Sequence, residues 1–183
     1  MLAYVFWHRP RDDADTGAYE RADADLHRSL QRERAGGLIE SATARVGELP
    51  RLKGGGYEDW YVVPGYAGLG ELAAAAATGA HADPHGRAAG MLAEGTAGLY
   101  EHLDGDGGVA HATHATWVER PPGARYPALA DLFSGADGPF RAGLWRRALV
   151  LGPAPELCVL HDANFAPAAP DGWRTFTATR EAP

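Results

Sequence analysis

The chain has 183 residues, of which 45% are hydrophobic and 22% are charged, and 17 basic residues stand against 24 acidic ones for a net charge of -7. This composition excludes a disordered chain, a collagen-like fibre and a membrane-spanning protein. A chain of this length buries roughly 70% of its unfolded surface, so its core needs neither disulfides nor a structural metal. The acidic balance and the lack of a basic stripe argue against a nucleic-acid partner.

The first apolar stretch, Leu2 to Trp7, predicts a strand. It is rich in aromatic and β-branched residues and is followed at once by Arg9-Pro10, which ends a strand. The stretch is too short for a signal peptide and has no basic residue before it. We therefore expect a cytoplasmic location and no contact with a membrane.

The next segments predict a helix followed by two strands. Between residues 18 and 34, apolar residues recur at spacings of three and four with charged residues between them, which is typical of an amphipathic helix. Gly36-Gly37 ends this helix. Strands are then expected at residues 38–46 and 57–63.

A helical region in two pieces follows the third strand. The alanine-rich stretch 69–77 predicts the first piece, and apolar positions between Pro84 and His102 predict the second. A flexible loop is expected at 104–108. Residues 111–120 then predict a strand, which Pro121-Pro122 ends.

From this point the order of elements repeats. Thr116–Pro121 can be laid on Val5–Pro10, a helix is expected at Tyr126–Phe133, and strands are expected at 143–151 and 156–160. We therefore predict an α+β protein in which two ferredoxin-like β-α-β-β repeats face each other as an α/β barrel within one chain. The halves are residues 1–108 and 109–162, and residues 163–183 form a tail with one edge strand at Trp173–Thr179.

Three short stretches resemble a known family. Arg9-Pro10, Tyr19-Glu20-Arg21 and Leu26–Leu30, which contains His27, are similar to the opening of EthD-type members of the dimeric α/β-barrel superfamily. The resemblance implies a pocket for a hydrophobic ligand, either between sheet and helices or inside the barrel. It also implies functions as varied as cofactor-free oxygenation, isomerisation, polyketide cyclisation and haem binding. Relatives form dimers, so a homodimer is possible here too.

The ends of the first strands in the two halves offer an acid/base pair. Side chains alternate along a strand, so Tyr4, Phe6 and His8 share one face. In the repeat, Trp117 takes the place of Phe6 and Glu119 that of His8. An imidazole titrates near neutrality and a carboxylate in an aromatic pocket has a raised pKa, so His8 and Glu119 are candidate catalytic residues.

Further candidates lie on the first helix and on later strands. His27 follows Asp23 by four residues on a helix, so the carboxylate is placed to orient its ring. On the third strand, Asp59 and Tyr61 share a face that carries a carboxylate. Arg147, on a strand of the second half, is a candidate for binding an oxygen of the substrate.

We interpret the protein as a cofactor-independent enzyme. Its catalytic candidates transfer a proton to or from a hydrophobic aromatic or polyketide-like molecule, as in a cyclase, an isomerase or a monooxygenase. No metal site is expected, because the histidine pairs lack ligand spacing. Two alternatives remain: a haem protein with an axial His102 or His114, and a non-catalytic ligand-binding or stress-response barrel.

Overall fold

The computed structural model describes residues 1–125, 143–149, 154–162 and 169–183. Its elements in chain order are β1 (Leu2–Pro10), α1 (Thr16–Glu33), the short 3-10 turn η1 (Ala35–Gly37), β2 (Glu40–Val46), β3 (Gly56–Val63), α2 (Tyr66–Ala76), the 3-10 turn η2 (Gly79–His81), α3 (Ala82–Met91), β4 (Leu92–Asp104), β5 (His114–Glu119), β6 (Gly143–Arg147), β7 (Leu157–His161) and β8 (Arg174–Glu181).

The described strands close into one antiparallel barrel in the order β1-β3-β2-β8-β5-β7-β6-β4. Within this ring, the first four strands are neighbours in the order β4-β1-β3-β2 and are linked by helices in a β-α-β-β-α-β sequence, which is the ferredoxin-like arrangement. The last four strands are neighbours in the matching order β8-β5-β7-β6. The duplication itself stays a prediction, since the helix expected at 126–133 lies outside the described residues.

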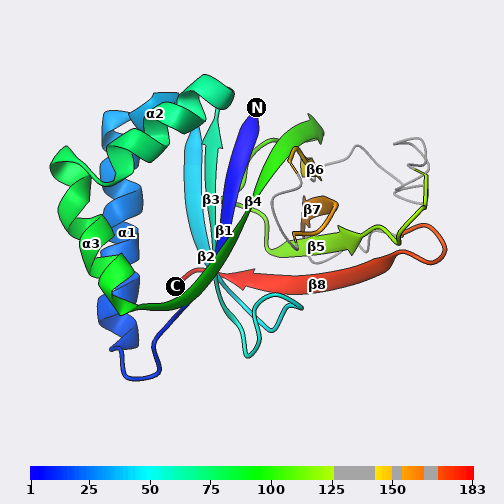
Figure 1. Ribbon diagram of the computed structural model, residues 1–183, viewed down its shortest axis with the longest axis horizontal. Helices are drawn as coiled ribbons and strands as arrows, with labels where there is room; N and C mark the ends of the chain where they lie inside the picture. The colour runs from blue at the N-terminus through cyan, green and yellow to red at the C-terminus, as the bar shows by residue number, and fades with distance from the viewer. Residues whose placement is uncertain (126–142, 150–153, 163–168) are drawn as a thin grey trace.

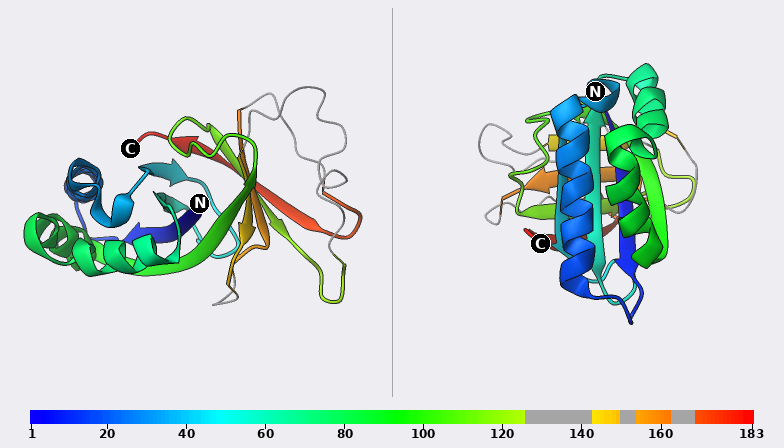
Figure 2. Two further views of the ribbon diagram at one scale, coloured as in Figure 1. Left: turned by 90° about the horizontal axis from the view of Figure 1, so that it is seen from above. Right: turned by 90° about the vertical axis from the view of Figure 1, so that its left-hand side faces the viewer.

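The helices of the described chain lie on one side of the molecule. Figures 1 and 2 show α1, α2 and α3 covering the outer face of the β4-β1-β3-β2 half, while β5 to β8 complete the barrel on the far side. None of these helices combines the length and the apolar character needed to cross a lipid bilayer.

Helix α1 forms where the sequence predicts it. Its N-terminus is capped by the Asp15 side chain, which accepts a hydrogen bond from the Ala18 backbone at 2.6 Å. It ends in a left-handed cap at Arg34, whose backbone N–H donates to carbonyls of the last helical turn. In the following turn η1, Gly36 has a φ of 62°, and a Cβ there would come within 2.2 Å of the Gly68 carbonyl oxygen. This close approach packs the start of α2 against η1.

The second helical region is shorter than predicted. Helix α3 ends at Met91, and Leu92–Asp104 is strand β4 rather than the second part of a helix. Strand β4 pairs with β1 and with β6, so it supplies hydrogen bonds that the barrel needs. Gly95 permits this pairing, because a Cβ there would lie 2.4 Å from the Phe6 ring.

The C-terminal segment is part of the barrel rather than a tail with an edge strand. Strand β8 pairs with β5 on one side and, through Arg45 and Val46, with β2 on the other. It therefore joins the two halves of the barrel.

The barrel interior surrounds a buried carboxylate. Glu58 is fully buried and accepts hydrogen bonds from the indole N–H groups of Trp7, Trp60 and Trp117 at 2.8 to 3.1 Å. The Arg180 guanidinium forms an ion pair with it at 3.2 Å. Because every indole of this group donates inward to one acceptor, Glu58 fixes the packing of the barrel core.

Replacing this carboxylate is expected to weaken the fold. Glu58→Gln leaves the Arg180 charge buried without its counter-ion, so the free energy of unfolding should fall by about 3–5 kcal/mol in urea denaturation. The control is Glu101→Gln, whose ion pair with Arg146 is exposed and should contribute at most about 1 kcal/mol. Equal, small effects of both variants would contradict the role given to Glu58.

Candidate functional site

A cavity of about 400 Å³ lies between the three helices and the outer face of the sheet. Its walls are mostly apolar, with a group of polar side chains on one side. The residues that line it are Tyr4, Phe6, His8, Tyr19, Asp23, Leu26, Leu30, Asp59, Tyr61, Leu69, Leu72, Ala73, Ala76, His85, Ala88, Ala89 and Leu92.

Strand alternation determines what the sheet contributes to the cavity. On β1, Tyr4, Phe6 and His8 face the helices, whereas Trp7 faces the barrel interior. On β3, Asp59 and Tyr61 face the helices. The faces that the sequence predicts for these residues are confirmed.

Helix α1 contributes three polar side chains at helical spacing. Tyr19, Asp23 and His27 follow one another at intervals of four residues, so they lie along the same face. All three are buried, with exposed fractions of 2%, 4% and 6%. The helix thus presents a polar stripe to the sheet, flanked by the apolar residues Leu26 and Leu30.

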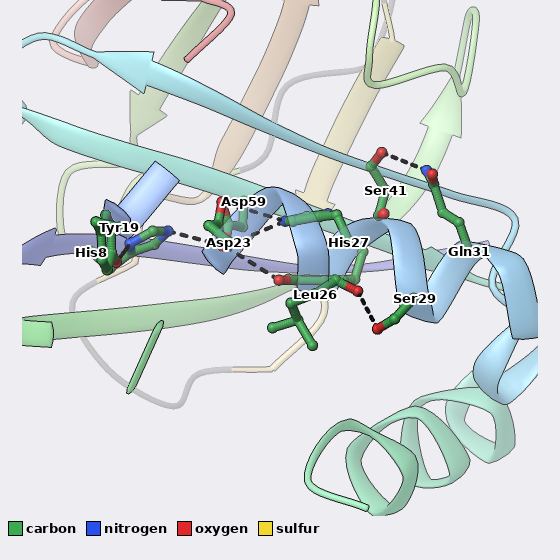
Figure 3. Close-up of polar contacts among 10 residues, drawn as sticks. His8, Tyr19, Asp23, Leu26, His27, Ser29, Gln31, Ser41 and Asp59 are labelled. Atoms are coloured by element: carbon green, nitrogen blue, oxygen red, sulfur yellow. Dashed lines mark hydrogen bonds and ion pairs between the residues drawn. The ribbon is translucent and has the colours of Figure 1, made fainter. Parts of the chain in front are cut away.

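The Asp59 carboxylate links the helix to the strands, as Figure 3 shows. Its Oδ2 lies 3.0 Å from Nε2 of His8 and 3.6 Å from Nε2 of His27. The hydroxyl of Tyr61 donates to the same oxygen at 3.3 Å. Nε2 of His27 also lies 4.0 Å from Oδ2 of Asp23. Two carboxylates and two imidazoles therefore form one buried cluster.

The ring of His8 has close neighbours on several sides. The rings of Phe6 and Tyr57 stack against it, with centroids 4.9 and 5.6 Å away. Its Nδ1 forms a short hydrogen bond with the Tyr19 hydroxyl, opposite the contact of Nε2 with Asp59. Such fixed geometry suits a group that must transfer a proton in one direction.

The charges in the cluster favour protonated histidines. Burial opposes the charge on each ring, but the charge of Asp59 and its hydrogen bonding outweigh burial and raise the pKa of His8 and of His27 above 6.5. Burial also works against ionised Asp59, yet the two imidazoliums hold its pKa well below the ordinary value. Asp59 is thus the permanent anion of the cluster.

Asp23 titrates close to neutrality. Burial and the nearby charge of Asp59 raise its pKa to about 6, while the histidines act in the opposite sense. Since Asp23 and His8 both line the cavity, a carboxyl group and an imidazole that gain or lose protons near neutral pH lie beside any bound molecule.

The donor atoms of His8, Asp23 and Asp59 lie within 4.8 Å of one another. In the described part of the chain, these three residues are therefore the ones spaced closely enough to bind a metal ion together. The expectation of a metal-free site stays a prediction.

The structure brings together most of the residues that the sequence selected and leaves three elsewhere. Tyr4, Phe6, His8, Asp59 and Tyr61 line the cavity, and His27 lies directly behind Asp59. The other three candidates, which lie outside the cavity, are Glu119, Trp117 and Arg147.

Each of these three residues has another partner. Trp117 packs in the barrel interior against Trp7, with ring centroids 4.9 Å apart. Glu119 forms an ion pair with Arg174, and Arg147 forms one with Glu156 at 2.8 Å. Because Trp117 shares the face of Trp7 rather than that of Phe6, the predicted alignment of the halves is wrong by one residue here, and Glu119 is not the counterpart of His8.

Sequence reasoning missed three polar residues that line the cavity, Tyr19, Asp23 and His85. The sequence points to Tyr19 only through the family resemblance, and to Asp23 only as the carboxylate that orients His27. The spacing of four from Tyr19 to Asp23, and again from Asp23 to His27, was the signal that could have found these two.

The predicted haem ligands lie outside this cavity. His102 packs against Trp145, with ring centroids 4.9 Å apart, and His114 stacks on His161 at 5.5 Å. Neither residue lines the cavity described above.

Comparisons with known proteins yield likenesses of structure only. No protein-family model matches the chain, and no curated protein matches it. A crystal structure of the Arabidopsis thaliana protein At3g17210 aligns with 58% of this chain and 99% of its own, at 11% identity and a TM-score of 0.47. A dimeric Bacteroides fragilis protein of unknown function and ferredoxin-like fold aligns with 55% of this chain and 94% of its own, at 8% identity and a TM-score of 0.41. The fold assignment given above comes from the strand order.

Removing the central carboxylate is expected to reverse the histidine pKa shifts. In wild type, NMR titration should give pKa values above 6.5 for His8 and His27. In Asp59→Asn both pKa values should fall below 6.5, because burial, which opposes the charge on each ring, is then no longer outweighed by the Asp59 carboxylate. Pairing with Asp59 therefore stabilises wild type fully below pH 6.5, and this stabilisation is lost as the pH rises through the folded-state pKa.

The control for this titration is Asp25→Asn, which removes a carboxylate of the same helix that pairs with Arg28 and Arg87. It should leave both histidine pKa values above 6.5. Unchanged histidine pKa values in Asp59→Asn would show that Asp59 does not set the protonation state of the cluster.

Proposed function

We propose that the protein is a cofactor-independent enzyme that transfers a proton to or from a hydrophobic, aromatic or polyketide-like small molecule bound in the cavity between helices and sheet. The observation that carries this proposal is the buried ion pair of His8 and Asp59 on the wall of a mostly apolar cavity. A titratable pair held rigidly in such a place is costly for stability and is typical of a site for acid/base chemistry.

The lining of the cavity supports the class of ligand. One wall carries the rings of Tyr4, Phe6 and Tyr61, and the helices add leucine and alanine side chains. Rings on one wall and small aliphatic groups on the other favour a flat, apolar molecule. A volume of about 400 Å³ suits a molecule of two or three fused rings.

The polar side of the cavity supports the class of reaction. Cyclisation, isomerisation and cofactor-free oxygenation of such molecules all begin with loss of a proton from carbon to give an enolate. The imidazole of His8 can accept this proton, and the negative charge of Asp59 stabilises the imidazolium that forms. Which of the three reactions follows the enolate depends on the reactive groups of the ligand and on whether molecular oxygen takes part.

We also propose that the chain is an internally duplicated relative of the EthD-type barrels that acts in the cytoplasm. The matching strand orders of the two halves support the duplication. A chain that closes its own barrel with β8 and β6 has less need of a second copy than a chain with a single half, so a homodimer is not required for the site.

Enolisation can be measured without knowing the natural substrate. β-Tetralone is a flat bicyclic ketone with an acidic C–H next to its carbonyl, and exchange of that hydrogen for deuterium in heavy water is read by NMR. We expect wild type to accelerate exchange and His8→Ala to lower the enzyme-dependent rate at least about 100-fold, the scale of general acid/base catalysis.

The matched control is His111→Ala, because His111 is an exposed histidine outside the cluster. Its exchange rate should equal that of wild type. If His8→Ala, folded as judged by thermal unfolding, exchanged β-tetralone as fast as wild type, proton transfer by His8 would be ruled out. Binding of β-naphthol without any exchange of β-tetralone would favour a non-catalytic ligand-binding barrel.

Metal removal gives an independent test of the cofactor-free proposal. Dialysis of the purified protein against EDTA should leave the exchange rate of β-tetralone unchanged, because the proton acceptor is an imidazole. Metal analysis before and after dialysis checks that removal was complete, and an absorbance spectrum checks for haem. Loss of exchange that returns with Zn²⁺ or Mg²⁺ would show that a metal ion takes part.

A further inference from the structure

Both ring nitrogens of His8 already have a polar neighbour. Its Nδ1 contacts the hydroxyl of Tyr19, and its Nε2 lies 3.0 Å from Asp59. The rings of Phe6 and Tyr57 stack against the imidazole. A ligand atom that met either nitrogen directly would displace one of these neighbours, so a neighbouring group that holds a proton of its own is the better placed contact.

Tyr19 is placed to be that neighbour. It lines the cavity, it is 2% exposed, and its hydroxyl touches Nδ1 of His8. It projects from the first turns of α1, whose N-terminus is fixed by the Asp15 cap. Burial is the main cause that raises the pKa of Tyr19, followed by the negative charges of Asp59 and Asp23, so its hydroxyl stays protonated at neutral pH.

From this geometry we infer that the Tyr19 hydroxyl is the catalytic residue that meets the ligand, and that it relays the proton between ligand and His8. This inference rests on the proposed function and identifies the group through which the proton passes. Tyr19, His8 and Asp59 then form a chain of donor, base and orienting carboxylate, the same division of roles as in a nucleophile–histidine–aspartate triad.

The proton balance of the relay is complete in both directions. When a ligand C–H bond breaks, its electron pair stays on the ligand as the enolate, and the proton passes to the Tyr19 oxygen. The relay uses the neutral form of His8, which is present above the folded-state pKa of the ring. The hydroxyl hydrogen of Tyr19 moves at the same time to Nδ1 of this neutral ring, giving an imidazolium paired with Asp59. The reverse movement protonates the product and restores the neutral ring, so no oxidant or other reactant is consumed.

Asp23 is the rival for this role, because its carboxyl group also lines the cavity and its pKa is about 6. Asp23 lies nearer to His27, however, with 4.0 Å between Oδ2 and Nε2, and His27 does not line the cavity. Four titratable groups surround Tyr19, namely His8, Tyr57, Asp23 and Asp59. In the described part of the chain, the rings of His8 and Tyr57 contact the Tyr19 ring.

The experiment compares deuterium exchange of β-tetralone in wild type, Tyr19→Phe, Asp23→Asn and a matched tyrosine variant, Tyr100→Phe. Tyr100 also has a buried hydroxyl, but it donates to the Pro155 carbonyl in the barrel core. We expect the enzyme-dependent exchange rate of Tyr19→Phe to fall at least about 100-fold, and that of Tyr100→Phe to stay within about threefold of wild type, because general acid/base catalysis is lost only in the first. Asp23→Asn should lower the exchange rate less than Tyr19→Phe does and should shift its pH profile.

Binding of β-naphthol, a planar mimic of the enol, gives a readout that needs no turnover. In wild type the naphthol hydroxyl donates a hydrogen bond to the Tyr19 oxygen, whose own hydrogen is directed at Nδ1 of His8. Tyr19→Phe should therefore weaken binding about tenfold in a fluorescence titration, whereas Tyr100→Phe should not. Thermal unfolding checks that Tyr19→Phe is folded, and if it is not, Tyr19→Leu, which also lacks the hydroxyl, takes its place.

The outcomes separate the two proposals. Loss of exchange in both Tyr19→Phe and His8→Ala supports the relay. Wild-type exchange in Tyr19→Phe together with loss in His8→Ala overturns the relay and leaves the proposed function standing. Loss in Asp23→Asn with wild-type exchange in Tyr19→Phe assigns the role to Asp23 and overturns the inference. Failure of wild type both to exchange β-tetralone and to bind β-naphthol overturns both proposals.

Discussion

Two consecutive carboxylates on β3 are buried on opposite faces of the sheet, and the rest of the structure is arranged around this constraint. Glu58 points into the barrel and Asp59 toward the helices, because neighbouring side chains of a strand alternate. A buried carboxylate costs several kcal/mol unless it is paired, on the order of the whole stability margin of a domain. Each face must therefore supply its own donors.

The two faces of the sheet hold their carboxylates with different donor groups. Glu58 is held by three indole N–H groups and the Arg180 guanidinium, and large side chains pack around it in the barrel interior. Asp59 is held by two imidazoles and by the hydroxyl of Tyr61, and it faces a cavity. In the described part of the chain, the cavity beside Asp59 therefore lies at one of the two pocket positions that the family resemblance implies, between the sheet and the helices.

Local sequence patterns predicted those parts of the site whose position depends on neighbouring residues in the chain. Period-two alternation placed Phe6 and His8 on one face and Asp59 on the face of Tyr61, and helical spacing predicted α1. The predictions that proved wrong depended on which distant strands pair with each other. The stretch after Met91 has apolar residues at helix-like spacing, but two partner strands make it β4, and Gly95 and Gly98 were a local sign against a helix. In the second half, a one-residue error in register moved Trp117 and Glu119 to the wrong face.

The polar stripe on α1 shows why a buried polar site on a helix is hard to find from one sequence. It also shows what the burial of polar residues indicates about a cavity. Tyr19, Asp23 and His27 occupy positions where an amphipathic helix gains stability by burying apolar side chains. Asp23 and His27 would each cost stability alone, and their burial becomes tolerable beside Asp59, which lies more than thirty residues further along the chain. An apolar stripe of leucines would hold α1 to the sheet at lower cost. Polar groups that a fold keeps at the expense of stability, gathered around one cavity, are the feature on which the proposed function rests.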